Sequence, residues 1–200
     1  MRKLIKLRFY TELFSHLSGL VFPSTKSLDK IPNSNLYKKN AVYYLYNYRD
    51  PKIKELIYEI KFSNNKKVFE HLGKELSSKI YNLVDIENTI ILPVPQTNNR
   101  RRERGFDVTN NLVKEIKKNI KIKSGYGILK NQRKDVQSKI KNYEERVSSV
   151  NKTIRLMSDI TDKKFIILDD VFTTGATLNE VKKVIEKNGG KTIACICVAH

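Results

Sequence analysis

The stretch 165–177, FIILDDVFTTGAT, joins an apolar segment, two carboxylates and a loop of small polar residues. Four apolar residues, 165–168, are followed directly by Asp169 and Asp170. The next residues are Val171, Phe172, Thr173, Thr174, Gly175, Ala176 and Thr177, and a helical pattern begins at Leu178. An apolar run of this length bounded by turn residues predicts a buried strand. The order of strand, acidic pair, polar loop and helix predicts a site for a sugar phosphate.

The polar loop is predicted to hold the phosphate group. A loop that opens a helix presents unpaired backbone N–H groups and the positive end of the helix dipole. Threonine hydroxyls add donors, and Gly175 permits a positive φ and a close approach of an anion to the backbone. The carboxylates of Asp169 and Asp170 repel a phosphate but accept charge-assisted hydrogen bonds from a sugar diol. A ligand that carries both a ribose diol and a phosphate therefore fits the whole stretch.

The composition is strongly basic, with 39 Lys and Arg against 21 Asp and Glu and a net charge of +18 in 200 residues. This balance favours polyanionic partners such as nucleic acid, phosphorylated small molecules or acidic lipid. Because the lysines are spread along the whole chain, a general bias toward solvated Lys explains most of them equally well. Cys195 and Cys197 lie two apart in a predicted strand and are expected to be reduced core residues on one face.

No run of 18 apolar residues occurs, so no membrane span is predicted. The basic N-terminus lacks both a long apolar core and a small-residue cleavage site, and we expect a cytoplasmic protein. Apolar residues at helical spacing over 4–21 predict an amphipathic helix. This helix either packs on the body of the protein or binds a membrane surface or a partner. Residues 23–40 have linker composition, so we expect an N-terminal helix and linker at 1–40 and a main domain at 41–200.

Strand and helix patterns alternate through the main domain. Strands are predicted at 41–48, 88–94, 125–129, 165–168 and 192–198. Helices are predicted from Pro51 to the break at Asn64–Asn65, and at 68–83, 107–120 and 178–187. The alternation across 88–198 predicts an α/β fold, with a mostly parallel sheet flanked by helices on both faces.

A second candidate site follows the strand predicted at 88–94. The sequence there continues into Gln96–Gly105, QTNNRRRERG, which contains Arg100, Arg101, Arg102 and Arg104. Arginine pairs bidentately with phosphate oxygens, and ligands of open α/β sheets bind at the carboxyl ends of the strands. The alternative is a solvated start of a helix. The polar segment 130–155 is either a mobile lid or an ordinary surface helix.

The stretch DDVFTTGAT after an apolar strand resembles the signature with which type I phosphoribosyltransferases bind 5-phosphoribosyl-1-pyrophosphate (PRPP). Over residues 41–200 the chain is similar to the ComF competence family, also called ComFC or GntX-like. The resemblance rests on YRDPKIKELIYEIKF, on LPVP followed by RRRERGF, on Arg133, Gln137, Arg146 and Asn151, and on LDDVFTTGATLNE. It implies a type I phosphoribosyltransferase-like fold.

The resemblance also implies a role for each part of the site. Asp169 and Asp170, as the catalytic pair, would hold the ribose hydroxyls, and the loop from Thr173 to Thr177 would hold the 5-phosphate. The residues expected to bind pyrophosphate are Val94, Pro95, Gln96, Arg101 and Arg104. The residues expected on a flexible loop are Arg133, Gln137 and Arg146. Mg²⁺ would be bound through PRPP oxygens and waters, without direct protein ligands.

The chain departs from the family at its N-terminus, where many members carry a four-cysteine zinc module. Residues 22–40 contain no cysteine, so we expect no zinc site in this extension. Asp107 is a second departure, because members often have Asn after the RGF motif.

The resemblance leaves two functions open, both tied to natural transformation. The first is transfer of a phosphoribosyl group to a nitrogen acceptor with release of pyrophosphate. The second is a non-catalytic module that binds single-stranded DNA and a ComF-type DNA helicase and uses the PRPP fold as a scaffold or sensor.

Overall fold

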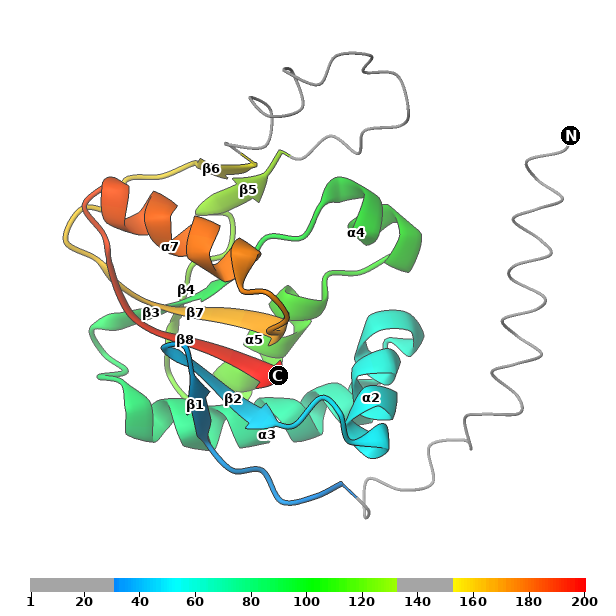
Figure 1. Ribbon diagram of the computed structural model, residues 1–200. Coiled ribbons are helices and arrows are strands. Elements are labelled where there is room, and N and C mark those ends of the chain that lie inside the picture. Colours follow the sequence, from blue (N-terminus) through cyan, green and yellow to red (C-terminus); the bar gives the residue numbers. More distant parts are fainter. Residues whose placement is uncertain (1–30, 133–152) are drawn as a thin grey trace, which may run out of the picture. The chain divides into compact units, whose positions relative to one another are not determined.

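The computed structural model describes residues 31–132 and 153–200. The compact unit Asn33–His200 is built on a six-stranded sheet in the order β1-β2-β8-β7-β3-β4 (Figure 1). The strands of this sheet are β1 (Tyr37–Lys39), β2 (Val42–Tyr46), β3 (Thr89–Pro93), β4 (Lys123–Ser124), β7 (Lys164–Val171) and β8 (Lys191–Ala199). All neighbouring pairs are parallel except β1 and β2, which are antiparallel. A separate antiparallel ribbon consists of β5 (Leu129–Asn131) and β6 (Ile154–Leu156).

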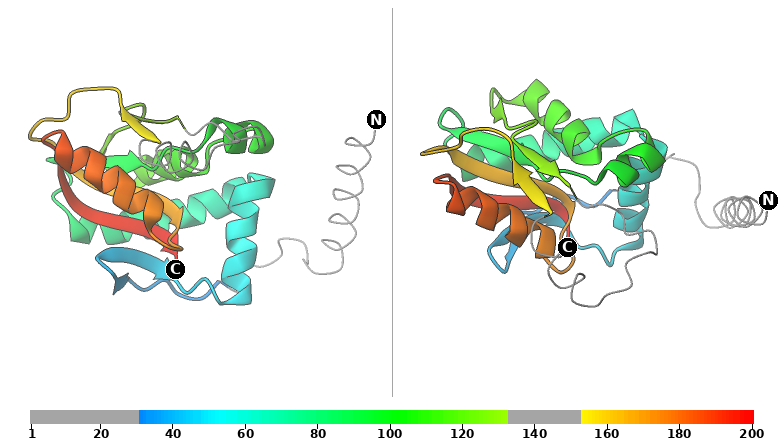
Figure 2. Two further views of the ribbon diagram at one scale, coloured as in Figure 1. Left: turned by 45° about the horizontal axis from the view of Figure 1, so that its top comes forward. Right: turned by 90° about the horizontal axis from the view of Figure 1, so that it is seen from above.

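Helices cover both faces of the sheet, as the alternating pattern predicts. The described helices are α2 (Pro51–Tyr58), the π-helical turn η2 (Glu59–Ser63), α3 (Lys66–Leu83), α4 (Asn98–Arg104), α5 (Val108–Asn119) and α7 (Ala176–Lys187). The views in Figures 1 and 2 show α3 and α5 on one side of the sheet and α7 on the other. The α/β fold with a mostly parallel sheet is therefore confirmed.

Apolar side chains alternate along the central strands and form a core on each face. Phe165 and Ile167 of β7 join Cys195 and Cys197 of β8 in the core that packs against α7. The intervening residues of β7, Ile166 and Leu168, are also fully buried, as expected of a strand with helices on both faces. Both cysteines are buried and unbridged, and they lie on one face as the spacing predicts.

Two local predictions need correction. Residues 125–129 do not form one strand, because Gly127 has a φ of +81° and the chain turns there between β4 and β5. β1 lies at 37–39, inside the stretch whose composition predicts a linker, because its backbone pairs with that of β2. The amphipathic helix predicted at 4–21 lies outside the described residues.

The parallel sheet also decides where a site can form. Along the chain, β3 is followed on one side by β4, whereas β7 and β8 lie on its other side. The strand order therefore reverses between β3 and β7, which run parallel in register from Thr89–Lys164 to Pro93–Leu168. At such a reversal the loops after the two strands separate and leave a crevice at the carboxyl ends. The two stretches that the sequence singles out follow these two strands.

Gly73 sets the close approach of α3 to α5, and its replacement should be costly. A Cβ added there would lie 2.4 Å from Glu115 Cβ and 3.0 Å from the Glu115 backbone carbon. We expect Gly73→Ala to destabilise the fold by about 1–3 kcal/mol, because the helices must move apart. Urea unfolding measures this loss. Lys74→Ala, at an exposed position of the same helix, is the matched control, and unchanged stability of Gly73→Ala would contradict the packing described.

Candidate functional site

A cavity of about 700 Å³ opens at the carboxyl ends of β3 and β7. Its walls come from the β3–α4 loop, helix α4, the end of β7 and the loop before α7. The residues predicted from sequence that line it are Val94, Pro95, Gln96, Arg104, Asp169, Asp170, Thr173 and Thr177. Residues separated by more than 70 positions in the sequence thus meet in one cavity because β3 and β7 are neighbours.

The two carboxylates, Asp169 and Asp170, lie near the C-terminal end of β7. The backbone N–H of Asp170 donates to Asp169 Oδ1 at 2.8 Å, and the N–H of Val171 donates to Asp170 Oδ1 at 2.7 Å. Each side chain is therefore held by the backbone of the residue that follows it. Burial, and then the adjacent Asp170 carboxylate, raise the pKa of Asp169 well above its ordinary value. The two side chains present oxygen acceptors to the cavity. Ionisation of Asp169 is unfavourable there because the group is buried and lies beside Asp170.

The loop after β7 forms a recess suited to an anion. Phe172 N–H donates to Ala199 O at 2.9 Å, which ties the start of the loop to β8. Gly175 has a φ of +76° and precedes α7, and it offers no side chain to cap the helix. The Ala176 N–H donates to Thr174 Oγ1 at 3.4 Å, and the following N–H groups of this first turn lack helical partners, as at the start of any helix. A small cavity of about 30 Å³ lies within the loop, and Thr173, Thr174, Gly175, Ala176 and Thr177 all contribute to its wall.

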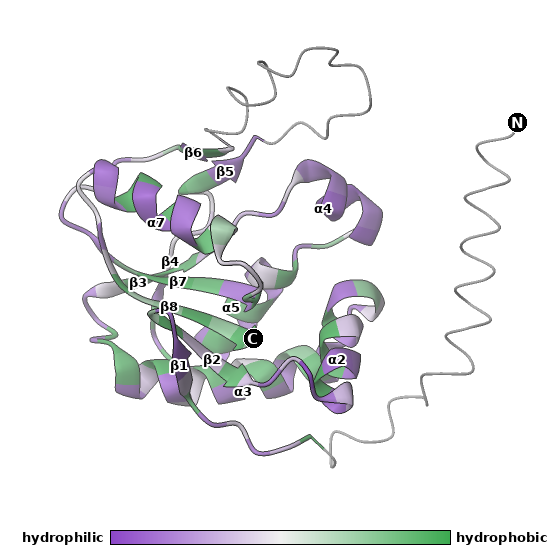
Figure 3. Ribbon diagram, in the orientation of Figure 1, coloured by the Kyte–Doolittle hydropathy of each residue, from purple (hydrophilic) through white to green (hydrophobic). Residues whose placement is uncertain are grey.

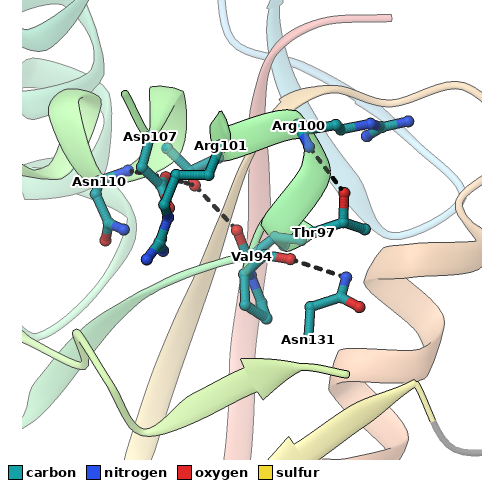
Figure 4. Close-up of polar contacts among 9 residues, drawn as sticks. Val94, Thr97, Arg100, Arg101, Asp107, Asn110 and Asn131 are labelled. Carbon is teal, nitrogen blue, oxygen red and sulfur yellow. Dashed lines mark hydrogen bonds and ion pairs between the residues drawn. The ribbon is translucent and has the colours of Figure 1, made fainter. Parts of the chain in front are cut away.

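The β3–α4 loop is fixed by hydrogen bonds from three directions, and Figure 4 shows the one from Asn131. Val94 N–H donates to Leu168 O at 2.9 Å, and Thr109 Oγ1 donates to Val94 O at 2.9 Å. Asn131 Nδ2 donates to Pro95 O at 3.1 Å. Thr97 then caps α4 by accepting from the Arg100 N–H at 3.3 Å. The loop holds its shape before any ligand arrives, which is what an anion site built on backbone groups requires.

The residues of helix α4 are strongly hydrophilic (Figure 3). Its arginines point to two different sides of the helix. Arg100 and Arg104 line the main cavity. Arg101 lies outside that lining and pairs with Asp107 at 2.9 Å, as its position in Figure 4 shows. The sequence pattern names Arg101 and Arg104 together, whereas the structure brings Arg104 and Arg100 to the cavity. Arg100 and Arg104 are four residues apart on α4 and share one face, whereas Arg101 lies on another face and pairs with Asp107, the cap of α5.

The polar segment 130–155 is only partly described by the structure. Arg133, Gln137, Arg146 and Asn151 lie outside the described residues. Arg155 lies in β6, is exposed, and does not line the main cavity. The flexible loop thus stays a prediction.

Several cavity residues are not evident from the sequence: Tyr48, Lys61, Asn99, Glu103, Asn131, Thr153 and Glu180. Glu180 is the most firmly held of them. Its Oε1 accepts from the N–H and the hydroxyl of Thr153 at 2.9 and 2.5 Å, and from Ile154 N–H at 3.1 Å. Glu180 lies three residues after Thr177 on α7, and this helical spacing is the one signal that places it on the same side.

The donor set of the cavity suits a metal ion that arrives with a phosphorylated ligand. Across 31–132 and 153–200, no group of three His, Cys, Asp or Glu side chains gathers to hold a metal ion. Asp169 and Asp170 provide acidic surroundings without a closed cage. Mg²⁺ commonly keeps several waters and uses substrate phosphates as ligands. The residues present are therefore compatible with Mg²⁺ held through ligand oxygens.

Comparisons with known proteins agree with this geometry. The model of the phosphoribosyl transferase domain matches residues 62–200. The chain is 25% identical over 169 residues to competence protein ComFC of Bacillus subtilis, which covers 80% of this chain and 63% of that protein. It is 32% identical over 103 residues to competence protein ComFC of Streptococcus pneumoniae, covering 50% of this chain and 43% of that protein. The matched part of the chain thus spans 43% to 63% of the length of these relatives.

The solved structures found are more distant. Adenine phosphoribosyltransferase from Leishmania donovani aligns over 81% of this chain and 60% of that chain, with 12% identity and a TM-score of 0.43. A likeness of this size adds nothing to the assignment. The family model covers most of the chain, including both loops of the cavity, and the ComFC relatives confirm the resemblance to the ComF family. By its match over 62–200, this chain belongs to the phosphoribosyl transferase domain family.

Proposed function

We propose that this protein binds PRPP in the cavity between β3 and β7, as a ComF-type member of its family. The observation that carries the proposal is the meeting of three groups in one cavity. Asp169 and Asp170 offer acceptors for a ribose diol, the loop before α7 offers a phosphate recess, and Arg104 adds a cation across the cavity. These are the charges that a ribose with phosphates at both ends requires.

The same arrangement supports transfer of the phosphoribosyl group. A nitrogen acceptor would attack the anomeric carbon while the bond to the pyrophosphate oxygen breaks. The leaving pyrophosphate takes the bonding electron pair, and the nitrogen loses its proton to solvent. Mg²⁺ bound to the ligand would neutralise part of the leaving charge. Asp169 and Asp170 would stabilise the positive charge that develops on the sugar, by analogy with glycoside chemistry.

Arg100 and Arg104 are placed for the other half of this reaction. Both line the cavity from α4, on the side opposite the carboxylates' own strand. Guanidinium groups pair bidentately with phosphate oxygens and would stabilise the leaving pyrophosphate. Pro95 and Gln96 lie beside them, and the Oε1 of Gln96 is buried without a partner within the described part of the chain. Because pyrophosphate oxygens only accept, this acceptor would suit a water that comes with ligand-bound Mg²⁺ and donates to it.

The setting we propose is the handling of incoming DNA. Relatives of this chain are named competence protein ComFC, and others, 23% identical over 154 residues, are named DNA utilization protein YhgH. The net charge of +18 favours contact with a polyanion. The second candidate function is therefore a non-catalytic module that binds single-stranded DNA and a ComF-type DNA helicase and uses PRPP as a signal.

Calorimetric titration with PRPP and Mg²⁺ tests the proposal. We expect binding by the wild type and a loss of about 10-fold in affinity for Arg104→Ala, because a charge-assisted contact to pyrophosphate is removed. Arg102→Ala is the matched control, since Arg102 is exposed on the same helix and does not line the cavity. Absence of PRPP binding by the wild type would refute the proposal.

Two further assays separate the transferase from the DNA-binding module. Pyrophosphate release from PRPP in the presence of a panel of nitrogenous bases indicates transfer. Affinity for single-stranded DNA that falls steeply as salt is raised, without pyrophosphate release, indicates the module.

A further inference from the structure

The turn between α2 and α3 is π-helical and lies against the cavity. The turn η2, Glu59–Ser63, continues directly from α2 and ends at Asn64, whose φ of 48° is left-handed. Such turns are rare and frequently occur at functional sites. Neither the fold nor the core needs this one to differ from an ordinary helical turn, since only Ile60 of its five residues is buried. Any role of this turn therefore lies in the contacts of its exposed and half-buried side chains.

Lys61 of this turn forms an ion pair with Asp170. Its Nζ lies 3.2 Å from Asp170 Oδ2, and the side chains of Lys61 and Asp170 are only 21% and 15% exposed. The Val171 N–H uses the other oxygen, Oδ1. A carboxylate accepts about four hydrogen bonds, so Asp170 keeps acceptor capacity for a sugar hydroxyl while Lys61 stays in place. The lysine fixes the carboxylate without filling the diol site.

Phe62, the next residue, contacts the arginine side of the cavity. The guanidinium of Arg104 lies over the Phe62 ring at 5.5 Å from its centroid. A cation held in this way is fixed in direction but keeps its N–H donors, because the contact uses the face of the planar group. Phe62 is 60% exposed, so burial in the core does not explain its position.

The turn is itself anchored at both ends. Asn65 Nδ2 donates to Glu59 Oε2 at 3.2 Å, across the whole turn. Asn111 Nδ2 of α5 donates to Asn64 Oδ1 at 3.3 Å. Lys61 and Phe62 are adjacent in the turn and point in different directions, Lys61 toward Asp170 of β7 and Phe62 toward Arg104 of α4. A single rigid element thus touches both halves of the cavity.

We propose that the π-helical turn is a positioning element of the ligand site: Lys61 holds Asp170 oriented for the ribose diol, and Phe62 holds Arg104 over the pyrophosphate position. This inference rests on the proposed PRPP site. The charged and titratable groups that face Asp170 are Asp169 on its own strand, Lys61 of η2, Arg104 of α4 and Cys197 of β8. Lys61 and Arg104 are the cations among them. The charge of Lys61 lowers the otherwise raised pKa of Asp169, so removal of Lys61 should raise this pKa further.

Ribose 5-phosphate and PRPP distinguish the two contacts, because only PRPP carries the pyrophosphate. Lys61→Met is expected to weaken both ligands by about 10-fold, the usual size of a charge-assisted contact. It should also shift the pH at which affinity is half-maximal upward relative to the wild type, and Lys61→Arg should restore both. Phe62→Leu is expected to weaken PRPP by about 3- to 10-fold, the usual size of a cation–π contact, and to leave ribose 5-phosphate unchanged.

Lys54→Met, an exposed lysine of α2, is the matched control and should behave as the wild type. The pH shift is read as the difference between variant and wild type, so titration of the ligand itself cancels. If the wild type binds neither ligand, the proposed function fails. If the wild type binds both and Lys61→Met and Phe62→Leu match Lys54→Met, this inference alone is wrong. The inference is also wrong if the two variants lose thermal stability but show neither the different effects on PRPP and ribose 5-phosphate nor the pH shift.

Discussion

Asp169→Asn is expected to stabilise the fold at neutral and alkaline pH while it removes most of the affinity for ribose phosphates. Burial and the adjacent Asp170 raise the pKa of Asp169, so ionisation of this side chain opposes folding. Asparagine keeps the shape and the acceptor that the Asp170 N–H uses. It cannot lose a proton when the ligand binds, so it never becomes the charged oxygen that is a strong acceptor for a sugar hydroxyl. One substitution should therefore move stability and binding in opposite directions.

The pH dependence fixes the sign of the stability effect. Because the folded-state pKa is raised, the folded protein keeps a proton that the unfolded chain loses above about pH 4, the ordinary Asp value. Stability of the wild type therefore falls as the pH rises from about 4 toward the raised pKa. The variant lacks this loss. The difference in Tm should be near zero at pH 4 and grow with pH, by about 2–4 °C for each kcal/mol regained.

Differential scanning fluorimetry across this pH range measures the stability, and calorimetry with ribose 5-phosphate measures the affinity. We expect a drop of about 10- to 100-fold in affinity for the variant, the usual size of a lost charge-assisted contact. Asp162→Asn serves as control, because Asp162 lies in the turn before β7, at the opposite end of that strand from the site. A variant that loses stability at pH 8, or keeps full affinity, would contradict the placement of Asp169.

Gly175→Ala is expected to abolish most phosphate affinity. Gly175 has a φ of +76°, and a Cβ there would lie 2.5 Å from Cε2 of Phe172, whose ring is buried beneath the loop. A left-handed conformation costs an L-residue about 1–2 kcal/mol, and the contact adds to that cost. The loop must then change shape, and the N–H groups at the start of α7 lose their direction toward the recess. Affinity for ribose 5-phosphate should fall by about 100-fold.

Gly127→Ala separates the backbone cost from the effect on the site. Gly127 has a φ of +81°, and a Cβ there meets no atom within 4 Å. Both variants should lose stability through the backbone, but only Gly175→Ala should lose affinity for ribose 5-phosphate. Equal affinities in the two variants, measured by calorimetry, would show that the loop before α7 does not hold the phosphate.

Much of the fold follows from local pattern. The apolar runs that become β3, β7 and β8 are continuous and bounded by turn residues, which is typical of strands buried on both faces. Gly175 and the threonines around it mark the loop before α7 because few other residues suit that backbone. The core positions of β7 and of the two cysteines follow from the period of two along a strand. These features depend on neighbours in the sequence, so the sequence reveals them.

The residues that the pattern misses depend on distant neighbours. Arg100 and Arg104 are four residues apart and therefore share one face of α4, but which face lines the cavity depends on how α4 packs against the rest of the fold. Lys61 comes from a turn more than 100 residues before Asp170, and no spacing links the two. The turn at 125–128 resembles a strand in composition, but it needs the left-handed Gly127. Each of these is set by packing rather than by local preference.

A co-crystal structure with PRPP and Mg²⁺ tests the central claim most directly. The ribose hydroxyls should lie within hydrogen-bond distance of Asp169 and Asp170, with the 5-phosphate in the loop from Thr173 to Thr177. The pyrophosphate should lie beside Pro95, Gln96 and Arg104. PRPP bound elsewhere on the molecule, or bound with its diol turned away from the two carboxylates, would contradict the site described.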